Sequence, residues 1–317
     1  MPEPDVLKIV ADRLSGRLQP DHLTKRLRAE QRKESRPPGP LRQLWRQQKR
    51  DLGRNVIGTV LKATLMRARG QSNLLQGTVN EREVVIDKLP PAFNGFRVLH
   101  LSDLHLDMHP QLADVLIDLL KGVPYDICVI TGDFRARTFG PIEPCLQALQ
   151  QVRAALDSDI YCVLGNHDSL RMLPSIEAMD MSVLMNETVM LKRESASLAL
   201  IGVDDPHYFR TDNLSWATRN VPADVAKILL VHSPEIWREA AEAAIDLYLC
   251  GHTHGGQICL PGQYPLFVNA RAPRAMAGGA WHHGALQGYT SRGSGASVVA
   301  ARFNCPPEIT VHTLRAG

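Results

Sequence analysis

Residues that can bind metals recur along the chain, each at the end of an apolar run. Asp103 and His105 form the pattern D-x-H, and residues two apart on an extended segment project to the same side. Asp133 follows a glycine after a second run, and His252 and His254 are again two apart between glycines. A D-x-H or a lone histidine is common by chance, but five such motifs at five strand ends are not. The pattern therefore indicates a shared metal site.

The remaining candidate donors extend the same design. Asn166, His167 and Asp168 follow a glycine, and His232 ends another apolar run. Carboxylate, imidazole and amide donors without a thiolate suit borderline first-row ions such as Mn, Fe or Zn. Two such ions about 3.5–4 Å apart can share a carboxylate and clamp the attacking and leaving oxygens of a phosphoryl displacement. Asp133 is the expected bridge, because its strand should lie centrally among the others.

Five apolar runs must position these residues, and each reads as a buried strand. They are residues 96–105, 125–133, 159–168, 226–233 and 245–254. Helical patterns lie between them at 111–121, 142–156 and 235–244, and further strands are predicted at 79–86, 183–189, 197–203 and 308–314. Apolar strands alternating with helices predict an α/β sheet covered on both faces, with reactive groups beyond the carboxyl ends of its strands. Glycines at 132, 165 and 251 are expected to let the backbone approach the ions closely.

The motif order D-x-H, G-D, G-N-H-D, V-H, G-H-T-H resembles that of the calcineurin-like metallophosphoesterases. The run GHTHGGQICLPG and the tail SRGSG…RFNCPPEIT are similar to a branch of bacterial phosphodiesterases often associated with the membrane. The resemblance covers about residues 79–314. It implies the metallophosphatase fold, an α/β two-sheet β-sandwich flanked by helices with the site at one edge.

The resemblance also implies roles for the candidate residues. The first ion would be held by Asp103, His105, Asp133 and His254, and the second by Asp133, Asn166, His232 and His252. His167 would face the phosphate, where it stabilises charge or protonates the leaving oxygen, and Asp168 would hold its imidazole in position. The nucleophile would be a metal-bridging hydroxide whose pKa is lowered by the ions.

Three further residues are candidates for substrate binding. Where many members of the family have aliphatic or acidic residues, this chain has Arg135 and Arg137, which could grip a phosphate bidentately. The alternative is that they are exposed to solvent or pair with Asp107 or Glu143. His207, in a D-D-P-H loop, is expected to line the cleft.

Composition and charge bound the possible partners. The chain has 317 residues, of which 44% are apolar and 22% charged, as in an ordinary globular protein. Residues 1–75 carry a net charge of +10 and the rest −7. The basic part suggests an anionic partner such as a membrane surface, with peripheral contact through the N-terminus. The acidic body makes nucleic acid an unlikely partner. The oligomeric state stays open.

The chain is predicted to divide into a basic helical extension, residues 1–76, and a catalytic domain, residues 77–317. Helical patterns at 4–34 and 41–69 are separated by the breaker SRPPGP, and the extension is expected to be an appendage. The second pattern fits either a helix packed on the main domain or one lying on an anionic membrane. Without a signal peptide or a long apolar span, the predicted location is cytoplasmic, with possible attachment to the inner face of the membrane.

The predicted reaction is hydrolysis of a phosphomonoester, phosphodiester or pyrophosphate. The preference for a phosphodiester or pyrophosphate rests on the resemblance alone, since one fold hosts many substrates. One alternative is a lipid-linked substrate, as for a UDP-2,3-diacylglucosamine pyrophosphatase. Another is a non-catalytic scaffold that keeps the fold, although every expected ligand position is filled here.

Overall fold

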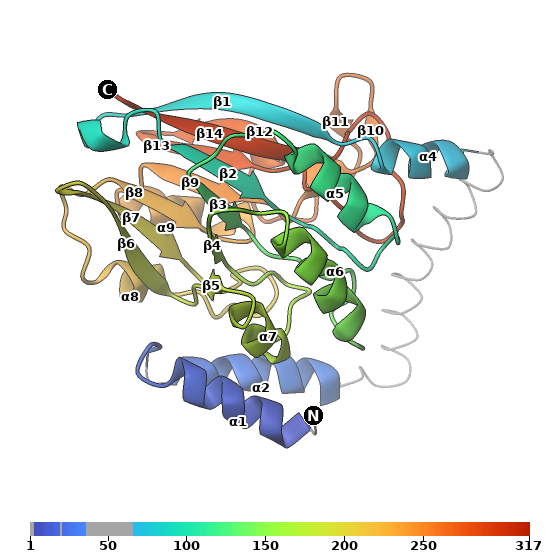
Figure 1. Cartoon of the computed structure of the whole chain (residues 1–317), viewed down its shortest axis with the longest axis horizontal. Helices are drawn as coiled ribbons and strands as arrows, with labels where there is room; N and C mark the ends of the chain where they lie inside the picture. The colour runs from blue at the N-terminus through green and yellow to red at the C-terminus, as the bar shows by residue number, and fades with distance from the viewer. Residues whose placement is uncertain (1–2, 20, 36–65) are drawn as a thin grey trace.

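The computed structural model describes residues 3–19, 21–35 and 66–317 (Figure 1). The α-helices are α1 (Glu3–Leu14), α2 (His22–Ser35), α4 (Arg67–Leu74), α5 (Leu112–Leu120), α6 (Glu143–Arg153), α7 (Leu173–Glu177), α8 (Leu214–Thr218) and α9 (Trp237–Glu242). Short 3-10 helices cover Pro91–Phe93, Leu170–Met172, Pro234–Ile236, His254–Gly256 and Arg274–Met276. The strands are β1 (Thr78–Ile86), β2 (Arg97–Leu101), β3 (Ile127–Ile130), β4 (Asp159–Cys162), β5 (Met181–Val183), β6 (Glu187–Arg193), β7 (Ala196–Gly202), β8 (Lys227–Leu230), β9 (Leu247–Cys250), β10 (Cys259–Leu260), β11 (Tyr264–Pro265), β12 (Gly279–His283), β13 (Leu286–Thr290) and β14 (Glu308–Ala316).

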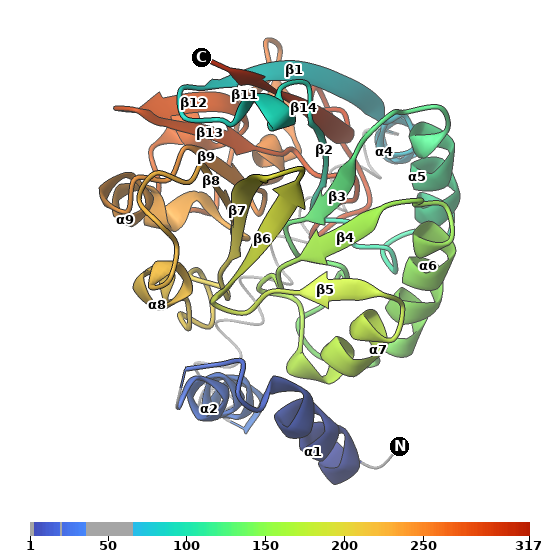
Figure 2. The same cartoon turned by 60° about the vertical axis from the view of Figure 1, so that its left-hand side comes forward.

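Within this part of the chain, twelve of the strands form two six-stranded sheets that face each other (Figure 2). The first has the order β1-β14-β2-β3-β4-β5 and the second β12-β13-β9-β8-β7-β6. Strands β2 to β5 are parallel, as are β7, β8, β9 and β13. The predicted two-sheet α/β sandwich is confirmed.

Alternation of side chains along each strand builds the layers. On β2, Val98 belongs to the cluster between the two sheets, whereas Leu99 and Leu101 belong to the cluster under the helices. Leu116 of α5 and Leu149 of α6 pack in this second cluster and cover the outer face of the first sheet. Helices α8 and α9 cover the second sheet in the same way. All six cysteines are buried free thiols.

The parallel strands bring their carboxyl ends to one edge of the sandwich. Strands β2, β3 and β4 of one sheet and β7, β8 and β9 of the other end there, and the loops that follow carry the candidate ligands. One predicted strand, residues 183–189, is wrong, because the chain turns at Asn186, whose φ is 60°. Strand β5 therefore ends before this turn, and β6 begins after it and pairs antiparallel with β7.

The N-terminal helices pack against the body. The single helix expected at 4–34 is two helices, because the chain leaves α1 at Gly16, whose φ is 75°. Val10 and Leu14 of α1 join the core under the first sheet, and Arg17 pairs with Glu177 at 2.7 Å. These helices are thus not a detached appendage, and the boundary at residue 76 stays a prediction.

The second predicted helical pattern, residues 41–69, lies mostly outside the described residues. Its last part overlaps α4, whose Leu74 is fully buried. Among the described residues, no helix is long and apolar enough to cross a bilayer.

Candidate metal centre

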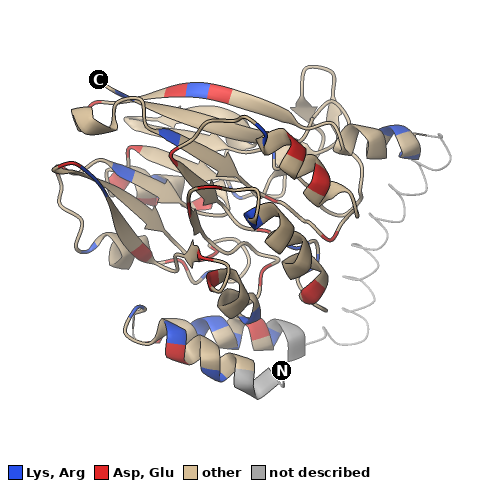
Figure 3. Cartoon of the chain, in the orientation of Figure 1, with Lys and Arg blue, Asp and Glu red and all other residues tan. Residues whose placement is uncertain are grey.

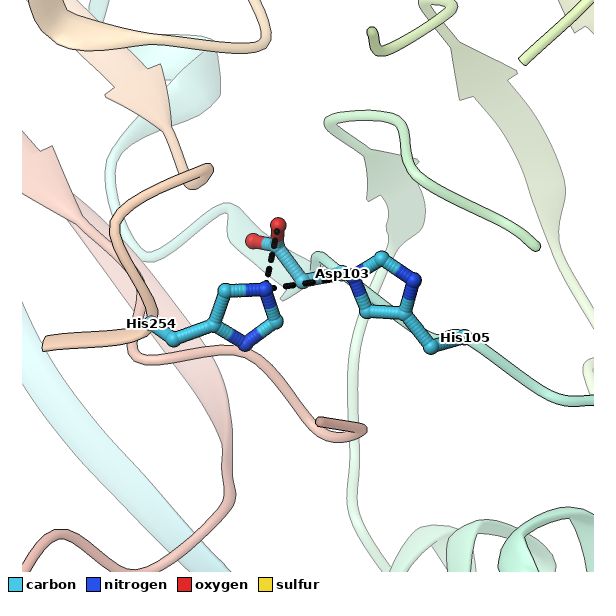
Figure 4. A group of neighbouring side chains, drawn as sticks. All are labelled: Asp103, His105 and His254. Carbon is cyan, nitrogen blue, oxygen red and sulfur yellow. Dashed lines mark hydrogen bonds and ion pairs between the residues drawn. The ribbon is translucent and has the colours of Figure 1, made fainter. Parts of the chain in front are cut away.

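Three expected ligands meet between the two sheets. Asp103 and His105 follow β2 of the first sheet, and His254 follows β9 of the second. Their side chains converge in Figure 4, where Nε2 of His254 lies 3.1 Å from Nε2 of His105 and 3.4 Å from Oδ1 of Asp103. All three are buried, and one ligand atom of each lies within 4.8 Å of the others, a grouping that can hold one ion.

A second group lies beside the first. Asp133, His232 and His252 each offer a ligand atom, again within 4.8 Å of one another. Nε2 of His232 lies 3.2 Å from Nδ1 of His252 and 2.9 Å from Oδ1 of Asn166. Donors bound to one first-row ion at about 2.0–2.2 Å are separated by roughly 3 Å, so the spacing suits coordination.

Asp133 stands between the groups. Its Oδ2 lies 3.3 Å from Nε2 of His232 and 3.8 Å from Nε2 of His105, which belong to different groups. Its Oδ1 accepts the backbone N–H of His167 at 2.8 Å. One oxygen is therefore anchored while the other faces both groups, as the predicted bridging role requires.

The backbone is strained where the ligands lie. Asp103, His105, Asp133, His252 and His254 have φ values of 49°, 42°, 56°, 72° and 52°. Non-glycine residues rarely adopt this left-handed conformation, and such strain gathers at functional sites. Two of the glycines allow the loops to pack closely: a Cβ on Gly165 would collide with Asp133, and one on Gly251 with Ser102 and Asp103. The predicted approach of the backbone to the ions stays a prediction.

Hydrogen bonds on the outer side fix which nitrogen of each ring faces inward. Three ligand histidines each donate one ring N–H to a backbone carbonyl, so the other nitrogen presents a lone pair to the site. These bonds are His105 Nδ1 to Arg135 O at 2.8 Å, His232 Nδ1 to Thr131 O at 2.8 Å and His252 Nε2 to Asn269 O at 2.6 Å. When both rings are neutral, the lone pairs of His232 Nε2 and His252 Nδ1 face each other at 3.2 Å, an arrangement that a cation stabilises.

The pKa shifts of the buried ligand candidates also indicate a cation site. Burial alone would lower the pKa of His232, but the Asp133 and Asp103 carboxylates raise it to about 10. Burial would raise the pKa of Asp133, yet His232 and His167 hold it well below its usual range. The carboxylates thus create a potential that favours positive charge between them, and the residues fit a pair of divalent cations.

A buried hydrogen-bond chain ends on Asp103, and sequence reasoning missed it. Ser102 Oγ donates to Asp103 Oδ2 at 2.8 Å, Thr131 Oγ1 donates to Ser102 Oγ at 2.7 Å, and His100 Nε2 lies 2.9 Å from Thr131 Oγ1. Because a carboxylate only accepts, each group in the chain must donate towards it. Burial lowers the pKa of His100 to about 3, which keeps the ring neutral. Since the Thr131 hydroxyl already donates to Ser102, the one ring proton of His100 must lie on Nε2. A histidine inside the apolar run 98–101 was the available signal.

The structure corrects the role predicted for Asp168. Its carboxylate accepts the backbone N–H groups of Gly165 and Asp133 at 2.8 Å and of Phe134 at 3.0 Å, so it shapes the two ligand loops. Nδ1 of His167 instead lies 3.1 Å from Thr138 Oγ1. The side chain of His167 is 21% exposed and close to the site, with Nε2 3.9 Å from Oδ2 of Asp133. This placement leaves the predicted role of His167 towards the phosphate open.

Of the two candidate arginines, Arg135 turns away from the site. Its guanidinium is buried and donates to the carbonyl oxygens of His167 at 2.6 Å, of Gly140 at 3.2 Å and of Thr138. The prediction that Arg135 grips substrate is therefore wrong: it braces the loop behind His167. Arg137 is exposed on the same loop, and its predicted contact with substrate stays untested.

His207 lies beside the second ligand group. Its ring centroid is 4.0 Å from that of the ligand candidate His252, and its Nδ1 lies 2.7 Å from Oε1 of Glu235. Arg271 Nη2 donates to the His207 carbonyl at 3.1 Å. Glu235 holds the ring and Arg271 holds the backbone of His207 beside the second group, while the predicted place of His207 in the cleft and its role in substrate binding stay predictions.

Helix α2 also reaches the ligand loops. Arg26 is buried and donates through Nη2 to the carbonyl of Asp168 at 3.0 Å. His22 Nε2 pairs with Asp204 Oδ2 at 3.0 Å, in the loop after β7. The helix thereby links loops of both sheets, a contact that the sequence pattern did not signal because the partners are more than 140 residues away in the chain.

Comparisons with known proteins agree with this site. A family model described as calcineurin-like phosphoesterase matches residues 96–256, the segment that carries all seven candidate ligands. The uncharacterized metallophosphoesterase YkoQ of Bacillus subtilis (strain 168) is 32% identical over 234 residues, which cover 71% of this chain and 85% of the relative. YkuE of the same organism, also an uncharacterized metallophosphoesterase, is 30% identical and covers 74% and 84%. The phosphodiesterase YaeI of Escherichia coli (strain K12) is 26% identical and covers 68% and 81%.

Proposed function

The chain belongs to the calcineurin-like phosphoesterase family, and from this premise we propose that it hydrolyses phosphodiester or pyrophosphate bonds with two divalent cations. The family and its hydrolase activity agree with the motif order. The bond type is proposed because a relative, YaeI, is named a phosphodiesterase. Fold and family by themselves leave the substrate open.

The observation that supports the proposal most directly is the pair of ligand groups that share Asp133. Three residues in each group can hold one ion, and Asn166 adds an amide oxygen to the second group. When bound, two cations in such a site activate the attacking water and neutralise charge on the phosphoryl group. The donor set suits Mn, Fe or Zn, and we propose that the native ions are among these three metals.

The chain's own residues supply orientation and a proton. The His167 side chain is partly exposed, its Nε2 lies 3.9 Å from Asp133 Oδ2, and Thr138 Oγ1 lies 3.1 Å from Nδ1, which fixes the ring's rotation. We assign His167 the donation of a proton to the leaving oxygen, a contribution typically worth about 10²–10⁴-fold in rate. Asp168 and Arg135 keep the loops of Asp133 and His167 in register through backbone bonds.

Turnover of bis-nitrophenyl phosphate by chelator-treated protein tests the proposal. Activity should be absent without added metal, return with Mn²⁺ and exceed activity on the nitrophenyl monoester. Absence of turnover with every divalent ion tried would support the non-catalytic scaffold instead. Preference for the monoester would refute the proposed bond type.

A further inference from the structure

An exposed apolar loop stands beside the candidate metal centre. It comprises residues 259–267, named here the β10–β11 loop, and it projects from the body in both views (Figures 1 and 2). Leu260, Tyr264, Leu266 and Phe267 expose 49%, 53%, 41% and 76% of their surface. They are four of the nine large hydrophobic residues exposed within the described part of the chain. Such a gathering of exposed apolar side chains marks a contact surface.

Polar contacts at its base hold the loop in this exposed shape. Cys259 N–H donates to the carbonyl of Phe303 at 2.9 Å. Arg274 donates to Tyr264 Oη at 2.7 Å and to the Leu266 carbonyl at 3.3 Å. These bonds fix the backbone of the loop and the Tyr264 hydroxyl, and contact with an apolar partner would remove the exposed apolar side chains from water.

The charge pattern defines the kind of partner. No acidic residue occurs between Asp246 and Glu308, and the loop itself carries no charged residue (Figure 3). Arg271 and Arg274, both exposed, follow it within seven residues. In space, Arg271 lies 3.8 Å from the Glu235 carboxylate of another segment, whereas Arg274 forms no ion pair within the described residues. Apolar and aromatic side chains beside an exposed arginine, in a stretch without acidic residues, match a membrane surface with anionic headgroups.

The loop leads directly into the candidate site. Asn269 follows Phe267 by two residues, which span at most about 7 Å of chain. The Asn269 carbonyl accepts Nε2–H of His252 at 2.6 Å, and Arg271 bonds to the His207 carbonyl at 3.1 Å. A surface in contact with Phe267 therefore lies next to His252.

We propose that the β10–β11 loop docks the chain on an anionic lipid surface and so presents the phosphate of a lipid headgroup to the metal centre. This inference rests on the proposed phosphodiester or pyrophosphate hydrolysis and narrows the substrate to a lipid-linked one. It does not depend on the basic helices α1 and α2, which lie at the opposite end of the molecule in both views (Figures 1 and 2).

Vesicle sedimentation of the full chain tests the inference. The vesicles contain phosphatidylcholine alone or with about one third phosphatidylglycerol, and the variant is the double change Leu266→Ser and Phe267→Ser. The matched control is Val85→Ser, which removes a side chain 50% exposed on β1. Wild type and control should partition onto the anionic vesicles, and the double variant about tenfold less or lower still, since two large side chains no longer enter the lipid. All three proteins should unfold at the same temperature, because the changed side chains are exposed.

The outcomes separate this inference from the proposed reaction. Equal partitioning of the double variant and the wild type, or no binding to either vesicle, would overturn the docking. A concentration-dependent dimer of the wild type that the double variant lacks would assign the loop to a second copy instead. Turnover of bis-nitrophenyl phosphate should be the same for all three proteins. Its absence in the wild type would refute the reaction and leave the vesicle result standing.

Discussion

Replacing Thr131 by valine removes one hydroxyl from the buried chain that ends on Asp103, and it changes the shape of the side chain very little. The hydroxyl donates to Ser102 Oγ at 2.7 Å and accepts from His100 Nε2, 2.9 Å away. Without it, Ser102 loses the donor that orients its own hydrogen towards Asp103. The backbone carbonyl of Thr131, which holds His232, is unchanged.

The expected magnitude follows from burial. Thr131 and Ser102 have no exposed surface, so no solvent replaces the lost bond. Leaving a buried polar partner unsatisfied costs about 1–3 kcal/mol, and loss of an outer partner typically weakens a metal site by about 10–100-fold. The matched control is Thr131→Ser, which keeps the hydroxyl and loses only a methyl group. The control should lower the free energy of unfolding by about 1 kcal/mol, as for other buried methyl groups, with little effect on metal binding.

Calorimetric titration of chelator-treated protein with Mn²⁺ measures the effect. Wild type should bind two ions, Thr131→Val should bind one of them about 10–100-fold more weakly, and Thr131→Ser should stay within about threefold of wild type. The reasoning is refuted if valine leaves both affinities unchanged. It is refuted equally if serine weakens binding as much as valine does, because metal affinity would then depend on packing and not on the hydroxyl.

Four further outcomes are expected. Asp133→Asn should lower both the metal content and the rate, measured by elemental analysis and diester turnover, because its Oδ2 faces both ligand groups. His167→Ala should keep the metal and slow turnover by about 10²–10⁴-fold; a metal-free variant would show that the assigned roles are wrong. Arg135→Ala should lower the melting temperature and kcat with little change in KM, since its bonds go to backbone carbonyls, and a selective rise in KM would restore a role in substrate binding. Burial by itself would raise the pKa of Asp204, but the opposite effect of Arg26 and His22 is larger. The pKa of Asp204 therefore lies below its usual value. The stability this provides is present at neutral pH and is lost as the pH falls below about 4, so urea unfolding of Asp204→Asn should depend less on acid than that of wild type.

The metal site could be predicted from sequence because its signals are local. A run of apolar residues predicts a buried strand, and a glycine followed by a polar residue, as at Gly132 and Asp133, indicates where that strand ends. Parallel strands then bring such ends together whatever the details of the loops, which is why Asp103 and His254 meet from different sheets.

Side-chain direction within the loops could not be predicted in the same way. Arg135 follows a ligand by two residues, yet it turns inward because three carbonyl oxygens of its own neighbourhood accept its hydrogens. Asp168 lies next to His167 in sequence, but the N–H groups of three loop residues compete for its carboxylate. The turn at Asn186 likewise depends on a single backbone angle, which an apolar pattern does not reveal.

Contacts between segments that are distant in the chain could not be predicted, because the local sequence pattern carries no signal for them. The packing of Arg26 against the Asp168 carbonyl joins residues 142 apart, and the helical pattern of α2 showed only a basic helix. The hydrogen-bond chain from His100 to Asp103 did leave a signal in the sequence, because a histidine in a buried strand needs a hydrogen-bond partner. Its partner, Thr131, lies on the neighbouring strand's end, so only the sheet register identifies it.

An anomalous difference map from a crystal of the wild-type chain soaked in Mn²⁺ tests the central claim most directly. The account predicts two peaks about 3.5–4 Å apart, with Asp133 bound to both. One should be surrounded by Asp103, His105 and His254, and the other by Asn166, His232 and His252. A single peak, or peaks away from these seven side chains, would contradict a two-metal phosphoesterase site.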